Sequence, residues 1–345
     1  MKKRTKIYIS LAVILLLVAG SAFAFRKQLA VMAFDLFLSK RVESSLQKSY
    51  QPLESQDNTP SKPAEPVVYE NKPFSVMLLG SDQRKDEPAR SDTLIYAVVR
   101  PKDSKVLLIS IPRDTYTEII GKGKKDKITH AYAFGGQQMS KDTIEAFLDH
   151  KVDYYATINF QGLKDAVNAL GGVELPIGKD IVNKGYDHEK FTIKANKPIY
   201  TGEEALNYVR YREDSDFNRT KRQQVFLDAV ANRMLHLNQI SKIPELLDIM
   251  GDNFQTDMQP KFIIDLAKQV LTGSEAQISS YTIMGEGMKI DGIYYDDPNE
   301  KDVEKAKKLI DSWKNPNTSP EQLMEPDDTD DTDNKDDKAE VSTVK

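Results

Sequence analysis

The sequence of 345 residues contains no cysteine and only four histidines, which are His130, His150, His188 and His236. The absence of cysteine excludes disulfide frameworks, thiolate metal sites, iron–sulfur clusters and thiol nucleophiles. Four scattered histidines offer little for a histidine-rich metal site or for a Ser-His-Asp triad. Neither a nucleotide phosphate-binding loop nor a G-x-S-x-G nucleophile elbow is present, so the sequence gives no support to those two enzyme classes.

The central part of the chain also lacks a strong net charge. The total is −5, but four basic residues open the chain and residues 325–345 carry −6, which leaves −3 for everything between. A nearly neutral body gives no indication of nucleic-acid binding by bulk charge. We expect no nucleic-acid partner.

The longest apolar run is the uncharged segment 7–25 near the start of the chain. A run of 19 residues is close to the length of about 20 that spans a bilayer, and it exceeds the usual signal-peptide core of about 7–15. We therefore expect an uncleaved, single-pass anchor; a cleavable signal with its A-x-A site at Ala22–Ala24 is the alternative. The preceding basic residues predict a cytoplasmic N-terminus and an extracellular body.

Strand and helix patterns interleave along the body, which predicts an α/β fold with a central mixed sheet flanked by helices. The expected organisation is a cytoplasmic tail (1–6), a transmembrane anchor (7–25), a juxtamembrane helix with a Pro-rich spacer (26–73), one extracellular catalytic domain (74–314) and a disordered acidic tail (315–345). The expected strands are 74–79, 93–99, 106–111, 154–160, 173–177, 278–284 and 290–294, and the expected helices are 140–148, 162–170, 202–212, 220–237, 243–253, 260–271 and 298–313.

Two aspartates stand where neighbouring strands are expected to end and begin. Asp82 closes the strand that starts at Phe74, and Asp92 precedes the next strand. Both carboxylates could meet at one end of the sheet, where a carboxylate pair together with substrate phosphates commonly holds Mg²⁺. Two solvated loop acids would give the same spacing.

Basic residues gather in two further places. Arg113 directly follows the strand 106–111, where a structural salt bridge would explain it nearly as well as a ligand. Five cations lie within 13 residues, at Arg210, Arg212, Arg219, Lys221 and Arg222. Arg219 and Gln223 are four residues apart and share one helix face. Arginine binds phosphate with a bidentate grip, so these segments indicate a phosphate or pyrophosphate site; a solvated basic helix is the alternative.

Several ordered motifs together resemble the LytR-CpsA-Psr family. They are LLGSD ending at Asp82, RSDT at 90–93, SIPRD at 110–114, KITHAY at 127–132, NFQGL at 159–163, NALGGVELP at 168–176, ALNYVRYR ending at Arg212, and R-x-x-x-Q at 219–223. The match runs without a break over residues 74–240. The short basic start, single apolar run and exported body resemble that family as well.

The resemblance implies a magnesium-dependent phosphotransferase of the Gram-positive cell surface with a long apolar groove for a polyisoprenyl chain. Its donor would be an undecaprenyl-pyrophosphate-linked anionic glycopolymer such as wall teichoic acid. Its acceptor would be peptidoglycan, joined through a phosphodiester at O6 of N-acetylmuramic acid. Segments 160–170 and 225–237 are the candidates to line the groove, with ordinary core packing as the alternative.

The resemblance also assigns roles to residues. It implies that Asp82 and Asp92 hold Mg²⁺, with Mn²⁺ as an alternative ion. One of these two aspartates would assist the acceptor hydroxyl, and Arg113 would act with them in catalysis. The pyrophosphate would be bound by Arg90, Arg113, Lys127, Arg210, Arg212, Arg219 and Gln223.

A second hypothesis of a different class remains open. The chain could be a non-catalytic, membrane-anchored protein that binds polyisoprenyl pyrophosphates or wall polymer as an envelope sensor or transcription attenuator. A passive binder would need the arginines but could dispense with the metal, so Asp82→Ala discriminates between the two hypotheses.

Overall fold

The computed structural model describes residues 32, 39–53, 71–82, 90–185, 190–211, 216–235, 245–246, 248–249, 253–272 and 276–326. The expected anchor 7–25, much of the spacer and the acidic tail beyond residue 326 lie outside these ranges. Among the helices within them, none combines the length and apolar character that a membrane crossing requires.

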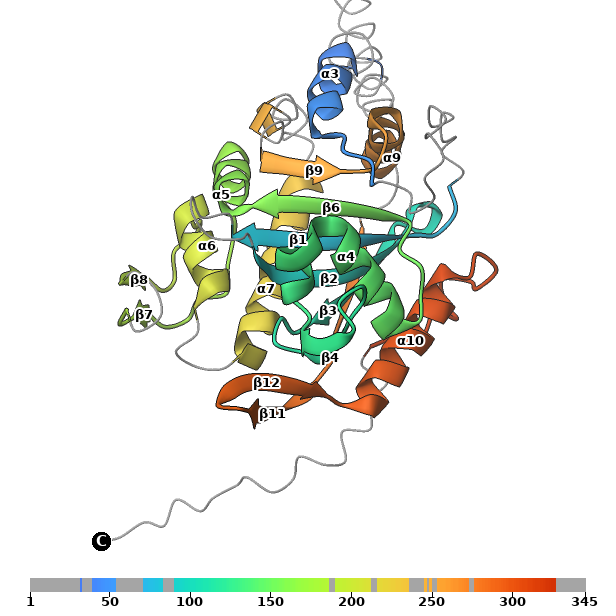
Figure 1. Cartoon of the computed structure of the whole chain (residues 1–345). Helices are drawn as coiled ribbons and strands as arrows, with labels where there is room; N and C mark the ends of the chain where they lie inside the picture. Colours follow the sequence, from blue (N-terminus) through green and yellow to red (C-terminus); the bar gives the residue numbers. More distant parts are fainter. Residues whose placement is uncertain are drawn as a thin grey trace, which may run out of the picture.

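A six-stranded mixed sheet forms the centre of the molecule (Figure 1). Its strand order is β10 (Gln277–Thr282), β3 (Lys105–Ile111), β2 (Arg90–Arg100), β1 (Phe74–Asp82), β6 (Tyr154–Asn159) and β9 (Phe254–Thr256). The pairs β1–β2, β2–β3 and β6–β9 are antiparallel, whereas β1–β6 and β3–β10 are parallel. The predicted α/β class with a central mixed sheet is confirmed.

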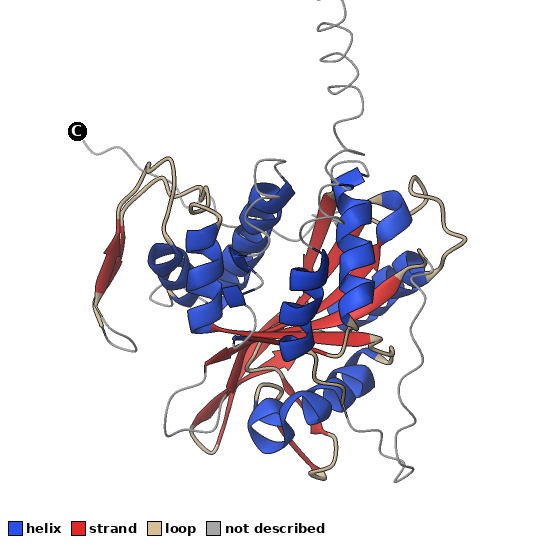
Figure 2. Cartoon of the chain, turned by 90° about the horizontal axis from the view of Figure 1, so that it is seen from above, coloured by secondary structure: helices blue, strands red, loops and turns tan. Residues whose placement is uncertain are grey.

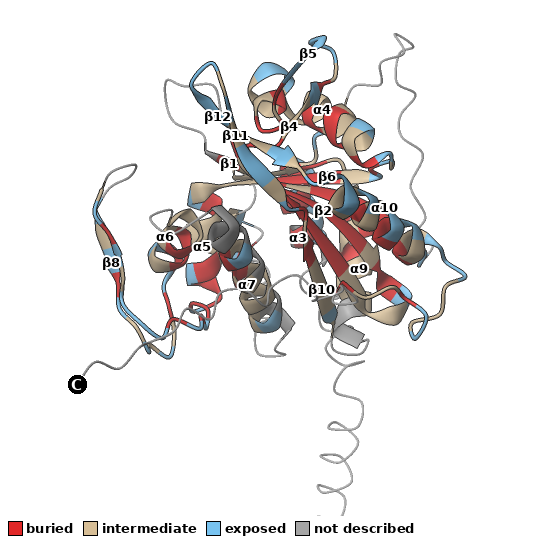
Figure 3. Ribbon diagram, turned by 90° about the horizontal axis from the view of Figure 1, so that it is seen from below, coloured by how far each residue is buried: buried red, intermediate tan, exposed pale blue. Residues whose placement is uncertain are grey.

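Helices cover both faces of this sheet (Figure 2). On one face α4 (His130–Leu148) and α10 (Glu300–Lys314) enclose a core that includes Met77, Tyr96 and Trp313, each fully buried. On the other face lie α5 (Phe160–Ala169), α6 (Gly202–Arg210), α7 (Asp216–Leu235) and α9 (Pro260–Thr272). Side chains of a strand alternate between faces, so β1 supplies Met77 and Leu79 to the first core and Phe74 and Val76 to the second. Figure 3 shows the buried strands between these helices.

The described residues also form three two-stranded hairpins outside the central sheet. They are β4 (Tyr116–Ile119) with β5 (Lys124–Lys127), β7 (Ile181–Asn183) with β8 (Phe191–Ile193), and β11 (Gly285–Ile290) with β12 (Ile293–Pro298). The strand expected at 290–294 is instead the turn of the last hairpin. Asp291 and Gly292 both have positive φ there, a backbone conformation that glycine adopts readily and that reverses the chain.

Two expected helix and strand boundaries also differ from the structure. α4 begins at His130, ten residues before the predicted start, and Ser140 is buried within it. Gly135 and Gly136 depart from helical φ and ψ and kink this helix, which continues beyond them. In the sequence, such a glycine pair is typical of a loop, so the helix was predicted to start after it. The segment 173–177 forms only an isolated bridge between Val173 and Tyr200.

The body extends beyond the expected catalytic domain at both ends. α3 (Ser39–Ser49) lies on β9 and α9 with Val42 and Leu46 buried, and the Tyr155 hydroxyl donates to the Gln51 carbonyl at 2.6 Å. At the other end, residues 315–326 pack on the body and are not part of a tail. Leu323 is buried in the core, and the Trp313 indole Nε1 donates to the Met324 carbonyl at 2.9 Å.

Candidate functional site at one end of the sheet

The predicted site residues on β1, β2 and β3 lie at the same end of the sheet. Asp82 is the Cα partner of Arg90 where β1 ends and β2 begins. Two residues further along β2 is Asp92, which lies beside the end of β3 because Leu94 pairs with Ile111. The backbone therefore brings Asp82, Arg90 and Asp92 together as the strand pattern predicted. The side chains of Asp82 and Arg90 are outside the part that the structure describes.

An alternating row of charges crosses this end of the sheet. Arg113 Nη1 donates to Asp92 Oδ1 at 2.7 Å, and Arg113 Nε donates to Asp114 Oδ2 at 3.2 Å. Lys127 Nζ lies 2.7 Å from the second oxygen of Asp114. The salt bridge weighed for Arg113 is thus present. About a quarter of the Arg113 side chain is nevertheless exposed at this rim, so the guanidinium remains accessible to a ligand.

Asp114 is the site residue that the sequence reasoning missed. It is buried, with an exposed fraction of 6%. Its two carboxylate oxygens hold one cation each, and a buried carboxylate needs such partners to remain charged. Its place directly after Arg113 was the available signal, because a residue next to a strand end shares the same rim. Asp114 therefore positions both Arg113 and Lys127.

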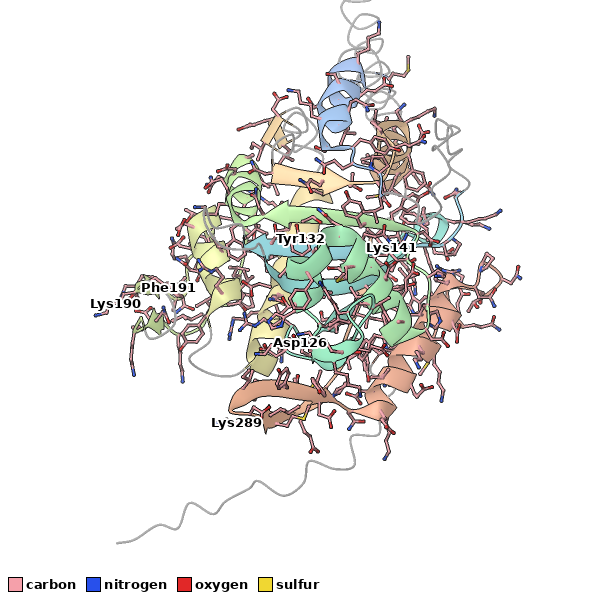
Figure 4. The ribbon with its side chains drawn as sticks, in the orientation of Figure 1. Asp126, Tyr132, Lys141, Lys190, Phe191 and Lys289 are labelled. Carbon is pink, nitrogen blue, oxygen red and sulfur yellow. The ribbon has the colours of Figure 1, made fainter. Side chains whose placement is uncertain are left out.

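The segment that carries Lys127 is fixed to the same rim by backbone bonds. Thr129 N donates to the Arg113 carbonyl at 3.2 Å, and the Thr129 hydroxyl donates to the Ser91 carbonyl. Tyr132, labelled on α4 in Figure 4, has its pKa raised by burial, while the Ser81 hydroxyl at the end of β1 hydrogen-bonds to it. The K-I-T-H-A-Y segment thus closes the end of β1, β2 and β3 from the α4 side.

The arginine-rich segment divides into site candidates and a structural residue. Arg210 is the last residue of α6, with its guanidinium carbon 5.0 Å from the centre of the Phe160 ring. Arg222 is buried, and its Nη2 donates to the Tyr211 carbonyl at 2.6 Å, which ties α7 to the end of α6. Arg212 and the side chain of Arg219 lie outside the described residues.

An apolar cavity of about 320 Å³ lies between the sheet and the helices α5, α6 and α7. Both segments expected to line a groove contribute to its wall. Its apolar lining comes from β1, β2, β6, α5, α6 and α7, including Leu78, Ile95, Ala156, Ile158, Leu163, Ala166, Leu170, Val209, Phe226, Leu227 and Val230. Leu246 and Phe254 complete it.

The cavity reaches the charged end of the sheet. Its wall includes Gln223, one of the predicted pyrophosphate ligands, and also Gly80 and Thr93 of β1 and β2. Gly80 and Thr93 are register partners. Gly80 lies two residues before Asp82, and Thr93 directly follows Asp92, the two predicted metal ligands. A Cβ on Gly80 would lie 3.1 Å from the Thr93 Cβ, so only glycine fits here without displacing Thr93. Gln223 places an amide on α7 across from these strands. An apolar chamber and a charged rim therefore adjoin one another.

The donors predicted for the divalent metal ion are the carboxylates of Asp82 and Asp92. Two aspartates at one sheet end suit Mg²⁺, which often takes one or two carboxylates and completes its shell with phosphate oxygens and water. Among the described residues no group of three His, Asp or Glu side chains forms a complete cage. Two carboxylates suit an ion whose remaining ligands are phosphate oxygens and water.

Comparisons with known proteins find matches over most of the chain. The LytR_cpsA_psr family model matches residues 36–311. A relative in Halalkalibacterium halodurans, named polyisoprenyl-teichoic acid–peptidoglycan teichoic acid transferase TagU, is 38% identical over 77% of this chain and 87% of its own length. The TagU of Bacillus subtilis strain 168 is 35% identical over 85% of this chain and 91% of its own length.

Solved structures show the same fold. A crystal structure of Bacillus subtilis TagV superposes with a TM-score of 0.62 and 31% identity, covering 71% of this chain and 98% of that one. A structure described as TagT bound to LIIa-WTA superposes with a TM-score of 0.58 and 29% identity, covering 76% of this chain and 99% of that one.

Proposed function

Since this chain belongs to the LytR_cpsA_psr family, we propose that it is a phosphotransferase of the cell surface. Its relatives named TagU support a transferase that acts on wall glycopolymer and peptidoglycan. The proposed donor is an anionic glycopolymer on an undecaprenyl-pyrophosphate carrier, and the proposed acceptor is O6 of N-acetylmuramic acid. The segment 7–25 would anchor the protein in the membrane with its body outside the cell.

One observation carries this proposal: the apolar cavity adjoins a rim of cationic side chains. A polyisoprenyl pyrophosphate has the complementary form, with a long apolar chain on a small, highly charged headgroup. Leu163, Ala166 and Phe226 would contact the chain, while Gln223 and Thr93 mark the transition to the headgroup. Burial of apolar chain stabilises such a complex by roughly 25 cal/mol per Å² of area removed from water.

The proposed reaction exchanges one phosphorus–oxygen bond for another. The acceptor hydroxyl oxygen attacks the sugar-proximal phosphorus and gives its proton to a base, for which Asp82 or Asp92 is the candidate. The bond from that phosphorus to the bridging oxygen breaks, and undecaprenyl phosphate leaves. The resulting product is a phosphodiester between the polymer and peptidoglycan.

The residues of the rim would stabilise charge as this bond breaks. The guanidinium of Arg113 is held from two sides by Asp92 and Asp114, so its orientation is set before substrate arrives. Lys127 is held by the same Asp114, and Arg90, Arg210, Arg212 and Arg219 would add cations around the pyrophosphate. Preorganised groups of this kind each typically contribute about 10²–10³ in rate. Asp82 and Asp92 would hold Mg²⁺, which supplies Lewis-acid polarisation of phosphate oxygens when bound.

The test is transfer of a lipid-pyrophosphate-linked saccharide to peptidoglycan by the full chain in detergent, with and without Mg²⁺. We expect product that depends on the metal and falls by about 10²–10³ in Asp82→Ala and Arg113→Ala. Tight donor binding without product, across several donors and acceptors, would instead favour the envelope sensor. Under that alternative Asp82→Ala would leave function largely intact.

A further inference from the structure

A hairpin rich in lysine begins at the site and extends away from it. We define the lysine hairpin as residues 116–127, which comprise β4, β5 and the turn between them. Its first and last residues, Tyr116 and Lys127, are register partners. Lys127 contacts Asp114 and so belongs to the charged rim. A strand rises about 3.3 Å per residue, so the hairpin leads roughly 10 Å outward from Lys127 to Lys124.

Three lysines line the outer part of the lysine hairpin. Lys122, Lys124 and Lys125 are all exposed. Lys122 Nζ and Lys124 Nζ lie 5.1 Å and 5.3 Å from the centre of the Phe134 ring, and Phe134 is itself 40% exposed. Lys125 Nζ lies 5.7 Å from the centre of the Tyr116 ring. The aromatic rings support the cations on one side and leave them open to solvent.

Acidic residues of the hairpin neutralise only part of this charge. Asp126 is buried and is occupied by the Lys127 backbone N–H, by His130 Nδ1 at 2.8 Å and by Lys124 Nζ at 3.2 Å. Glu118 is exposed and is the register partner of Lys125. Four lysines against these two carboxylates leave the hairpin with a net charge of +2, whereas the central part of the chain is negative overall. In Figure 4, Asp126 lies between α4 and the hairpin β11–β12 that carries Lys289.

The body holds this charged surface in place. Ile119 within the hairpin and Ile128 directly after it are fully buried, and Ile120 N donates to the Thr143 hydroxyl of α4 at 3.3 Å. Tyr116 also packs edge-on against Tyr295, with ring centres 4.9 Å apart. The cations therefore project from a packed support, so a ligand need not order a long loop in order to bind them.

The chemistry of the surface indicates one kind of occupant. Successive ammonium groups that lead out of a pyrophosphate site are complementary to a chain of phosphodiesters attached to the same ligand. An uncharged glycan would use the aromatic rings but would gain nothing from the lysines. Resting on the proposed function, we infer that the lysine hairpin binds the phosphodiester backbone of the donor's anionic polymer, beyond the pyrophosphate. Lys122, Lys124 and Lys125 would thereby make long polymer donors better substrates than short ones.

The experiment compares two donors and two sets of variants in the full chain. One donor carries a phosphodiester polymer on the lipid pyrophosphate, and the other carries only the linking saccharide. The test variant is Lys122→Gln, Lys124→Gln and Lys125→Gln together. The matched control replaces three exposed lysines elsewhere, Lys102, Lys301 and Lys308, by Gln. We expect kcat/KM for the polymer donor to fall about tenfold in the test variant at low salt, with the short donor changed less than twofold. Substitution of the same three residues by Arg should restore the polymer donor.

The outcomes separate this inference from the proposed function. Equal kcat/KM of wild type and test variant on the polymer donor overturns the inference and leaves the transferase intact. An equal fall on both donors also overturns it, because the lysines would then act on the shared headgroup. A rise in KM for peptidoglycan with either donor would assign the hairpin to the acceptor instead. Absence of transfer by wild type with both donors would count against the proposed function.

A binding measurement does not depend on transfer. Titration of soluble poly(glycerol phosphate) should show binding to wild type that weakens with salt and is lost in the triple Gln variant. Retention of that binding in the variant, or its absence in wild type, would overturn the inference.

Discussion

Arg113 Nη1 lies 2.7 Å from Asp92 Oδ1 and thereby joins the end of β3 to the beginning of β2. The sequence assigned these two residues to different tasks, one to phosphate and the other to metal. In the structure they orient one another, and Asp114 on the opposite side of the guanidinium completes the arrangement. A change in either residue should therefore affect both proposed tasks.

Arg113→Lys tests the geometry of this fork. Arg113 reaches Asp92 with Nη1 and Asp114 with Nε, and a lysine ammonium cannot reproduce that planar pair of donors. We expect a loss of 10- to 100-fold in transfer rate with little change in thermal stability. The matched control is Arg100→Lys. Arg100 is a buried arginine whose guanidinium binds Asp103 and the carbonyls of Trp313, Asn315 and Thr318, so lysine would likewise lose several planar donors. That control should lose stability but retain activity per folded molecule.

Asp114→Asn tests the positioning of two cations by one buried carboxylate. Without its charge, Arg113 and Lys127 lose a common partner. We expect donor KM to rise and kcat to fall, together at least tenfold in kcat/KM, because both cations are then positioned less firmly. Asp311→Asn is a suitable control, since Asp311 is a 75% exposed partner of His150. Unchanged kinetics of Asp114→Asn would show that the rim does not need this carboxylate.

Ala166→Phe tests the apolar cavity. Ala166 lies in its wall on α5, so a larger side chain would occupy space proposed for the lipid. We expect KM to rise at least tenfold for a donor with a long polyisoprenyl chain, and much less for a donor with a short prenyl chain. The comparison of the two donors in one variant separates blocked binding from a general loss of folding. Equal effects on both donors would contradict the assignment.

The pH dependence of the free energy of unfolding should reveal the stabilising contribution of the Asp126 carboxylate. Burial opposes its ionisation, but hydrogen bonds from the Lys127 N–H, His130 and Lys124 lower the pKa of Asp126 below its usual value. A folded-state pKa below the unfolded one means that the unfolded chain binds more protons. This contribution is therefore present above about pH 4 and is lost as the pH falls through the folded value. Urea unfolding of Asp126→Asn from pH 7 to 3 should show a smaller decrease than wild type over the acidic range.

The Asp228 carboxylate should have the opposite effect on stability as the pH changes. Burial raises the pKa of Asp228, and its Oδ1 has no hydrogen-bond partner among the described residues. Here the folded state favours the protonated acid, so stability is lost as the pH rises above the unfolded value. We expect Asp228→Asn to increase the free energy of unfolding at pH 7 and to have little effect near pH 3. A destabilised variant at pH 7 would show that the carboxylate has a favourable role.

Local sequence patterns determined many of the strands and helices of this protein. Apolar and β-rich runs predicted β1, β2, β3 and β6, and helical periodicity predicted α5, α6, α7 and α9, each to within a few residues. These patterns depend only on neighbours along the chain. The ordered motifs also identified the family and the end of the sheet where Asp82, Asp92 and Arg113 lie. The start of α4 was missed because Gly135 and Gly136 interrupt its local signal.

Only the tertiary structure decided how distant segments combine. The cavity needs Leu78, Leu163 and Phe226 side by side, although Leu78 and Phe226 lie 148 residues apart along the chain and Leu163 lies between them. The pairing of Arg113 with Asp92 and the packing of α3 and Leu323 on the body depend in the same way on contacts between residues that are distant in sequence. Sequence determines which side chains a strand or helix presents, since that is a property of a few consecutive residues. Which of them share a cavity or an ion pair is determined by the packing of the sheet and its helices, which no local pattern encodes.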